Sequence, residues 1–376
     1  MSVGALSVVR VEQIQLPDGK KVWLVSDYAG TRSVLTDPRL TTDPFRMGDK
    51  APFSAFPESV ASVMAHDMLN NDPPSHTRLR RLVTPTFTVR RIADHRPYVE
   101  QVAADLLDSF GETPDLVGDY AGPLATTVLG VLLGIPAEDA ADVRYWSELF
   151  VLDLLTRNDE AIDATHKLSG YTKKLVEERR RNPGDDLVSR LVSMRDDEDR
   201  LNDEELASTV FTLVIGGQTA TTQLLAKALY LLLTHPDQLE LLLADWSLLP
   251  SAVHEVLRID PPLQMTSFRM ATEPISLDGR TVPAGDIIVC ALKDANRDPA
   301  RFTDPERFDI QGGDSQHLGF GHGLHRCIGA NLAELQCQVG ITAFFTRFPH
   351  AKPVGEVSWR QTPLITALTS LTVERN

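Results

Sequence analysis

Apolar residues recur with helical spacing through the middle of the chain and with strand spacing near both ends. From about residue 58 to 258 the pattern predicts amphipathic helices, separated by turn signals such as NPGDD at 182–186. Over about 8–40, the β-type run KVWLVSD follows the turn signal LPDGK. From about 263 to 376, short strand patterns alternate with loops, apart from a last helix over about 328–348. These patterns predict a mainly α protein with a smaller β portion made from both ends of the chain.

The length and composition suit a large globular core. The chain has 376 residues, of which 42% are hydrophobic, and no linker-like segment divides it. We therefore expect one interlocked domain over residues 1–376, although the length alone would allow two.

The charge balance indicates which partners to expect. Lys and Arg number 37 against 52 for Asp and Glu, which gives a net charge of −15. Such an acidic chain is repelled by nucleic acid and by anionic membranes, so we expect neither as a partner. Small-molecule substrates are the better expectation.

The sequence gives no sign of export or membrane insertion. Its N-terminus lacks a basic start followed by a sustained apolar core, so it does not resemble a signal peptide. Residues 206–226 carry no charge, but their many Ser, Thr and Gln residues favour a helix buried in protein over one in lipid. Three cysteines, Cys290, Cys327 and Cys337, give no even-numbered disulfide framework, so we expect a reducing cytoplasm.

The strongest chemical signal is the loop HLGFGHGLHRCIGANLAELQ at 317–336. Glycines stand at Gly319, Gly321 and Gly323, a spacing that lets backbone approach a flat partner closely. Cys327 follows where the loop enters a helix, so free N–H groups and the helix dipole favour its thiolate. A thiolate in this position is either a nucleophile or a metal ligand.

Two other interpretations of these cysteines differ in how well they fit. A zinc site would combine Cys327 with His317, His322 or His325, but no C-x-x-C pair accompanies them. A purely structural role suits Cys290, inside an apolar strand, and Cys337, on the last helix. It does not explain the glycines that precede Cys327.

The cysteine loop carries a family resemblance. The pattern F-G-x-G-x-H-x-C-x-G, filled by Phe320, Gly321, Gly323, His325, Cys327 and Gly329, resembles the haem-binding loop of the cytochromes P-450. Further segments in the family's order extend the resemblance over about residues 12–375. It implies the cytochrome P-450 fold, with haem b (iron protoporphyrin IX) between the central helix and the cysteine loop. It also implies that the Cys327 thiolate is the axial ligand.

The resemblance assigns partners to the haem propionates. His76 and Arg80 lie four residues apart on one face of a helix that starts near Ser75, where two cationic donors can bind an anion. Matching the family's positions adds Arg269, in SFRMAT, and His325. Without the cysteine loop, the first pair would more simply be a solvated basic face.

A second arginine-containing pattern is expected to be structural. Glu255 and Arg258 lie three residues apart on one helix face, where they can form a salt bridge. In the family such a pair is buried near the haem loop and joined by an arginine of a PERF-like segment. Arg307, in Pro305–Phe308, matches that arginine.

The predicted activity needs electrons from outside the chain. The resemblance implies a haem-thiolate monooxygenase that takes electrons from NAD(P)H through a separate ferredoxin reductase and ferredoxin. From His76 to Arg96, both included, the chain has six arginines and a single acidic residue, Asp94. This local excess of positive charge would steer an acidic ferredoxin towards the cysteine side of the haem. Arg326 would extend this basic face, which otherwise is only a solvated surface.

The oxygen side departs from the family pattern. The central helix reads VIGGQTATTQ at 214–223, and alignment to the family's A-G-x-acid-T places Gly216 and Gly217 at the small positions beside O₂. Thr219 then takes the acid's place, Ala220 the alcohol's, and Thr221 follows. Because neighbouring helix residues point about 100° apart, a threonine replaces the missing hydroxyl only if the helix widens locally. Otherwise these threonines simply satisfy helix carbonyls.

Several functional alternatives therefore stay open. A hydroxyl or amine on the substrate, or an ordered water, would relay protons in place of residue 220, or the enzyme would perform an atypical oxidation such as aromatic coupling or desaturation. A haem ligand sensor without turnover is the alternative outside catalysis. The substrate pocket is expected at 52–64, near Val214 and Gly217, at 263–267 and near Ile365, which suits a medium-sized, partly hydrophobic organic molecule of secondary metabolism.

Overall fold

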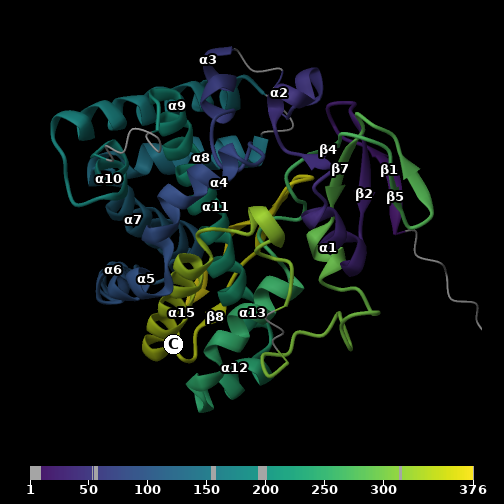
Figure 1. Ribbon diagram of the computed structural model, residues 1–376. Coiled ribbons are helices and arrows are strands. Elements are labelled where there is room, and N and C mark those ends of the chain that lie inside the picture. Colours follow the sequence, from purple (N-terminus) through teal and green to yellow (C-terminus); the bar gives the residue numbers. More distant parts are fainter. Residues whose placement is uncertain are drawn as a thin grey trace, which may run out of the picture.

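The computed structural model describes residues 10–52, 54, 58–153, 158–193, 201–312 and 316–375. Part of the predicted pocket loop at 52–64 lies outside these residues, as do the first two residues of the predicted β region at 8–40. Helices fill most of the molecule, and the largest sheet lies to one side of them (Figure 1). The expected mainly α architecture with a smaller β portion is confirmed.

The nine-residue helix Tyr28–Thr36 lies inside the region 8–40 that was predicted to be β, so that part of the prediction is wrong. The other helices mostly fall in the predicted central region, with one short helix before it and two after it. The helices have the following bounds. They are α1 (Tyr28–Thr36), α2 (Pro44–Met47), α3 (Glu58–Ala61), α4 (Ser75–Val83), α5 (Val89–Asp94), α6 (Arg96–Asp108), α7 (Gly122–Leu133), α8 (Ala140–Asp153), α9 (Asp159–Arg181), α10 (Leu187–Ser193), α11 (Asp203–Thr234), α12 (Pro236–Ala244), α13 (Leu249–Ile259), α14 (Leu292–Ala295) and α15 (Ala330–Arg347). Short 3₁₀ segments join several of them, including η2 (Ser62–Met64), η3 (Thr84–Phe87) and η7 (Gly323–His325).

The strands come from the two ends of the chain, as the sequence predicts. They are β1 (Val11–Gln15), β2 (Lys21–Val25), β3 (Leu40–Thr41), β4 (Arg269–Ala271), β5 (Ile275–Leu277), β6 (Arg280–Val282), β7 (Ile287–Cys290), β8 (Lys352–Pro353), β9 (Ser358–Gln361), β10 (Thr366–Ser370) and β11 (Val373–Glu374). The largest sheet has the order β1-β2-β7-β4-β3. Its β2 strand pairs in parallel with β7, with Trp23 opposite Ile288, so early and late segments share one sheet.

Helix α11 is the central element of the helical region. Its N-terminus is a capping box, in which Asn202 accepts from the Glu205 N–H and the Glu205 carboxylate accepts from the Asn202 N–H. The helix then runs for 32 residues through the main hydrophobic core, which α7, α8 and α15 also build. Gln223 holds β10 against it, because its side chain both accepts from and donates to the backbone of Leu368 (2.7 and 3.0 Å). The core therefore fixes α11 between the helical layer and the C-terminal strands.

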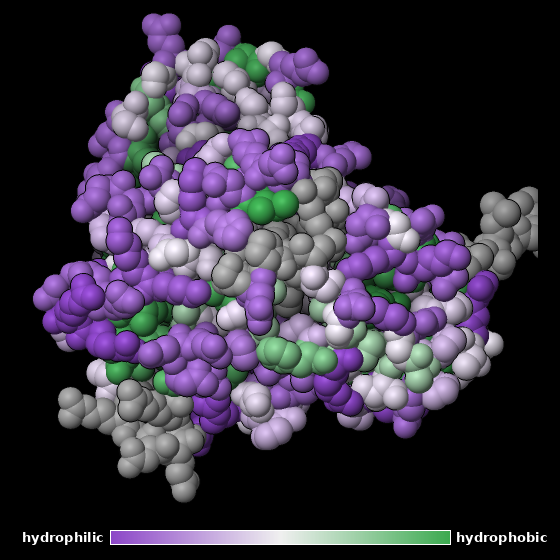
Figure 2. All heavy atoms as spheres, turned by 90° about the horizontal axis from the view of Figure 1, so that it is seen from above, coloured by the Kyte–Doolittle hydropathy of each residue, from purple (hydrophilic) through white to green (hydrophobic). Residues whose placement is uncertain are grey.

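A second apolar helical run also passes through this core. Leu116–Leu133 is long and apolar enough to cross a membrane by composition alone, but 72% of it is buried inside the protein. The face seen in Figure 2 is mostly hydrophilic, with small scattered hydrophobic areas. Because it is mostly buried, Leu116–Leu133 is a core helical segment of the protein, and residues 206–226 of α11 are buried in the same way.

Candidate functional site

The cysteine loop is fixed by backbone contacts to the segments around it. The Cys327 N–H donates to the Phe320 carbonyl (2.8 Å), which closes the loop on itself. Leu318 N–H donates to the side-chain oxygen of Asn296 (2.6 Å), and the Asn296 amide donates in turn to the Leu257 carbonyl of α13 (3.2 Å). The loop is therefore anchored to α13 before the chain reaches Cys327.

Two of the loop glycines are required by close approach to other backbone. A Cβ at Gly319 would lie 2.7 Å from the Leu257 carbonyl oxygen, and one at Gly323 would lie 2.8 Å from that of Leu35. Gly323 also has φ +71°, which a side chain disfavours. The predicted need for small residues holds, but at these two positions the partner is protein backbone and not a flat ligand.

Cys327 has an exposed side chain that many protein atoms nevertheless surround. This surrounding protein desolvates the thiol and raises its pKa. The Gly329 N–H and the charges of Arg326 and Arg80 lower the pKa in opposition. The sequence suggested that the helix start would favour the Cys327 thiolate, but this effect alone does not lower the pKa of the thiol below its usual value. A bound metal ion would be needed to stabilise the thiolate.

Glu255 and Arg258 form the buried pair that the sequence predicts. The Arg258 guanidinium donates two hydrogen bonds to the Glu255 carboxylate, at 2.7 and 2.8 Å, and both side chains are almost fully buried. Arg258 also donates to the carbonyl oxygens of Pro305 (2.7 Å) and Arg307 (2.8 Å). The Arg307 side chain was expected to join this buried pair, and that expectation is wrong. The side chain is 63% exposed, and its guanidinium lies 3.6 Å from the Asp309 carboxylate. The segment supplies its backbone to the cluster, so any residue type at 307 would satisfy that contact.

The four predicted propionate partners come together although they are distant in sequence. His76 on α4 and His325 in η7 have ring centroids 4.7 Å apart. Arg269, only 3% exposed, and Arg80 are close enough for their charges to lower the pKa of His325, which burial and these cations bring to about 3. The Arg80 guanidinium also donates to the Arg326 carbonyl (2.7 Å), which joins α4 to the cysteine loop.

This cluster has the properties of an anion site. Both ring nitrogens of His76 are buried and make no hydrogen bond of normal geometry among the described residues, although the Leu324 backbone lies close enough to act on the ring. The buried Arg269 guanidinium donates to a backbone carbonyl, that of Ser267 (3.3 Å). The negative charge of Asp72 raises the pKa of His325 in opposition to the arginines. The Asp72 carboxylate also accepts hydrogen bonds from Thr41, Thr42 and Arg46. Buried ring nitrogens with few partners, together with the Arg80 and Arg269 cations beside the Cys327 thiol, fit a haem with its two propionates.

On the oxygen side, one face of α11 is less covered than the rest of the helix, and we call the space in front of this face the hollow. From Leu206 to Leu229 the helix is buried except at Thr212, Ile215, Gly216, Gly217 and Ala220. A Cβ at Gly216 would meet no atom within 4 Å, whereas one at Gly217 would lie 2.9 Å from Leu129. Gly216 therefore borders open space, and Gly217 serves close packing as well. Val214 was predicted to line the pocket, but it is fully buried in the main core.

The threonines of α11 lie mostly on its buried faces. Thr219 and Thr221 are 2% and 6% exposed, and Thr219 donates to the side-chain oxygen of Gln218 (2.9 Å). Thr222 donates to the Gln218 carbonyl (3.1 Å). The helix continues through these residues as a regular α-helix, so the local widening considered from the sequence is absent. Ala220 alone, of the three predicted oxygen-side positions 219–221, faces the hollow.

Sequence reasoning missed a carboxylate near this face. Asp67, in the loop before α4, is fully buried and accepts from the Thr212 hydroxyl (2.6 Å). No helical period or family pattern links the two residues, since 145 positions separate them.

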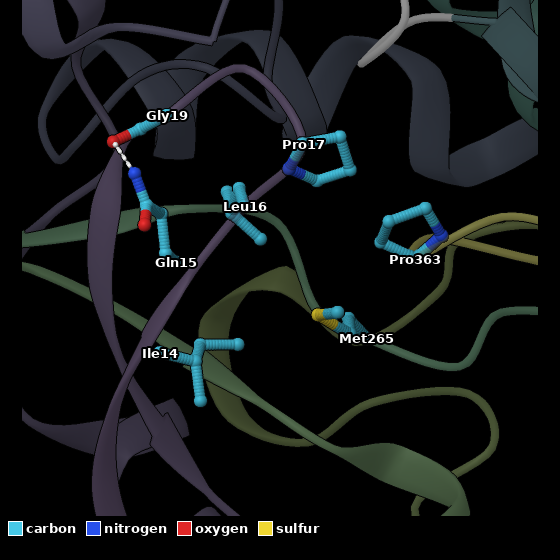
Figure 3. A pocket seen from close by; sticks show the side chains of 7 residues that line it. All are labelled: Ile14, Gln15, Leu16, Pro17, Gly19, Met265 and Pro363. Atoms are coloured by element: carbon cyan, nitrogen blue, oxygen red, sulfur yellow. Dashed lines mark hydrogen bonds between the residues drawn. The ribbon is translucent and has the colours of Figure 1, made fainter.

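An open surface pocket, separate from the hollow at α11, lies between the segment 14–19 and the residues Met265 and Pro363 (Figure 3). It has a volume of about 550 Å³ and is lined by Ile14, Gln15, Leu16, Pro17, Gly19, Met265 and Pro363. Met265 belongs to the predicted pocket segment 263–267, and an isolated bridge pairs Leu263 with Ile365. Two of the predicted pocket segments are therefore adjacent.

Comparison with known proteins identifies the family. The family model "Cytochrome P450" matches residues 141–370. The chain is 39% identical to the cytochrome P450 monooxygenase PikC of Streptomyces venezuelae, over 96% of this chain and 87% of that protein. The chain belongs to the cytochrome P450 family. It is also 40% identical to the 6-deoxyerythronolide B hydroxylase of Saccharopolyspora erythraea, over 94% of this chain and 90% of that one.

Solved structures confirm the cytochrome P450 fold. The tirandamycin C-bound P450 monooxygenase TamI superposes with a TM-score of 0.91 and 38% identity, over 98% of this chain and 94% of that chain. The chain is therefore a cytochrome P450 monooxygenase, an oxidoreductase whose cofactor is haem with a cysteine thiolate as axial ligand.

Proposed function

We propose that this cytochrome P450 inserts one oxygen atom of O₂ into a medium-sized, partly hydrophobic organic substrate of secondary metabolism. It receives electrons from NAD(P)H through a ferredoxin reductase and a ferredoxin in the cytoplasm, and the single domain 1–376 carries the whole site. The observation that carries the proposal is the Cys327 thiol beside the cluster of His76, Arg80, Arg269 and His325, together with the less covered helix face at Gly216 and Ala220. The names of the relatives above support secondary metabolism as the setting.

The residues divide into three roles in this proposal. Cys327 is the axial ligand, and thiolate-ligated haem supplies O–O cleavage chemistry when bound. His76, Arg80, Arg269 and His325 would hold the haem propionates through charge-assisted hydrogen bonds. The packed core around α11 holds the helix whose open face borders the hollow.

Proton delivery depends on the substrate in this proposal. Ala220 has no hydroxyl, and the hydroxyls of Thr219 and Thr221 are on buried residues of a regular helix. A hydroxyl or amine of the substrate, or an ordered water that it holds, therefore occupies the hollow beside Ala220 and passes protons there. Gly216, one turn earlier, leaves space for this group.

The Ala220→Thr variant tests this step. The product formed per NAD(P)H consumed would be measured with a substrate that carries a hydroxyl group and with the analogue that lacks this hydroxyl. We expect the wild type to be well coupled with the alcohol and poorly coupled with the analogue, and the variant to be coupled with both. The Thr222→Val variant, altered on a buried face, is the control. Substrate assistance is wrong if the wild type loses most electrons to peroxide with every substrate and Ala220→Thr corrects this.

The ferredoxin is proposed to dock on a basic face around the cysteine loop. Arg81, Arg90, Arg91 and Arg326 are exposed, and the Asn331 amide donates to the Phe87 carbonyl (2.8 Å), which holds η3 and α5 beside the start of α15. Exposed Val89 adds an apolar contact in the middle of these cations. Charge attraction to this face would raise the association rate with an acidic protein.

Charge reversal at two arginines tests the docking face. Arg90→Glu combined with Arg91→Glu should lower the rate of electron transfer from an acidic ferredoxin by about tenfold at low ionic strength. The difference should shrink at high salt, because screening weakens the steering. The control is Arg181→Glu, in an exposed residue at the end of α9. Equal loss in both variants would contradict docking at this face.

Atypical oxidation of the same substrate class is the alternative catalytic proposal. The absence of an acid–alcohol pair at 219–220 favours it. Product analysis with ¹⁸O₂ separates the two, since insertion labels the product and coupling or desaturation does not. A non-catalytic haem sensor would consume no NAD(P)H with any substrate.

A further inference from the structure

The exposed face of α11 begins two helical turns before Ala220. Thr212 is half-buried, whereas its neighbours Phe211 and Leu213 are buried. Thr212, Gly216 and Ala220 follow one another at four-residue intervals, so they lie along one side of the helix. From Thr212 to Ala220 the helix rises by about 12 Å. A ligand in the hollow can therefore reach both residues.

Asp67 fixes the orientation of the Thr212 hydroxyl. One carboxylate oxygen, Oδ1, accepts from the backbone N–H groups of Leu69 (2.6 Å) and Asn70 (3.1 Å). The other, Oδ2, accepts from the Asn70 side-chain amide (3.0 Å) and from Thr212 Oγ1 (2.6 Å). Ser208 Oγ lies 3.5 Å from the same oxygen. The two backbone donors cannot turn away, so they determine which oxygen faces α11.

This geometry decides what Thr212 offers to a ligand. A hydroxyl has one proton to donate and two lone pairs that accept. Burial raises the pKa of Asp67, and the hydrogen bonds from Thr212, Asn70 and Leu69 lower it in opposition. With Asp67 as a carboxylate, the Thr212 proton is used by it, so the free capacity of the Thr212 hydroxyl is that of an acceptor. A ligand group that meets Thr212 in the hollow must therefore be a hydrogen-bond donor.

We propose that Thr212, oriented by Asp67, selects substrates that place a hydroxyl or amine donor about two helical turns from the reacting end. The inference rests on the proposed function in that it takes the substrate to bind in the hollow beside Gly216 and Ala220. It adds a substrate class, namely elongated alcohols or amines. Asp67 acts as a positioning residue, and Thr212 contacts the substrate.

Binding of tethered imidazoles to the ferric holoenzyme tests this assignment without turnover. The probes are 1-alkylimidazoles of increasing chain length that end in either a hydroxyl or a methoxy group, and the Soret shift gives each Kd. At one chain length, we expect the hydroxyl probe to bind about tenfold more tightly than its methoxy counterpart. Thr212→Val should remove this preference, and Thr222→Val should keep it.

The Asp67→Asn variant gives a sharper result, since it should reverse the preference. The asparagine oxygen must stay on the two backbone N–H groups, so its NH₂ takes the place that faces Thr212. Thr212 would then accept from this NH₂ and turn its own proton towards the hollow. The methoxy probe, an acceptor, should then bind more tightly than the hydroxyl probe.

The outcomes separate this inference from the proposed proton delivery. Equal binding of hydroxyl and methoxy probes in the wild type at every length overturns it, as does an unchanged preference in Thr212→Val. If Asp67→Asn fails to fold, the Thr212→Val result still decides. A preference that behaves as expected while the Ala220→Thr test fails would leave Thr212 as a recognition residue and remove only the proton relay.

Discussion

On the side of Cys327, hydrogen bonds and a buried ion pair fix the loop backbone, whereas on the side of Ala220 the helix leaves space. The cysteine loop is joined to α13 through Asn296 and to α4 through Arg80. The Glu255–Arg258 pair holds the backbone of Pro305 and Arg307. On α11, a Cβ atom added at Gly216 would have no other atom within 4 Å. The contrast indicates that the protein fixes the cofactor and leaves the oxygen side to be completed by the substrate.

The largest expected effect lies on the fixed side. Glu255→Gln leaves the buried Arg258 without a charged partner, which should lower the free energy of unfolding by about 3 to 5 kcal/mol. Arg347→Gln, which breaks an exposed ion pair with Asp108, should cost less than about 1 kcal/mol. Chemical denaturation measures both. Similar losses for the two variants would contradict the view that the buried cluster stabilises this side.

A smaller effect, on haem affinity, is expected at Arg269, a proposed partner of the haem propionates. Arg269→Met removes one charge-assisted hydrogen bond, so haem affinity should fall about 10- to 100-fold. The stability of the haem-free protein should not fall, because burial of this guanidinium is unfavourable without an anion. The rate of haem transfer to excess apomyoglobin measures the loss, and Arg307→Met, in an exposed side chain, is the control. Equal haem retention in both variants would argue against a propionate contact.

The smallest effect is expected on the open side. Gly216→Ala should stabilise the protein by about 0.5 to 1 kcal/mol, because alanine is the better helix former and its methyl group meets no atom. Gly217→Ala should gain less or lose stability, since its methyl group would lie 2.9 Å from Leu129. Thermal unfolding of the two variants gives the order. The reverse order would mean that the space lies at Gly217 and not at Gly216.

Particular residues show where sequence reasoning succeeded and where it could not. The cysteine loop, the Glu255–Arg258 pair and the convergence of His76 with His325 followed from local patterns and from family order, which encode backbone position. The Asp67–Thr212 contact and the packing of Gly217 on Leu129 depend on how distant segments meet, which no periodicity shows. Arg307 was misjudged because a sequence pattern cannot tell whether a side chain or its backbone makes the contact.

The central claim is that Cys327 ligates haem through its thiolate. The most direct measurement is the absorption spectrum of the purified protein, reduced and exposed to carbon monoxide, beside that of Cys327→Ser. The wild type should show a strongly red-shifted Soret band that the variant lacks. A wild type that remains colourless after haem reconstitution, or a band that survives in Cys327→Ser, would contradict the claim.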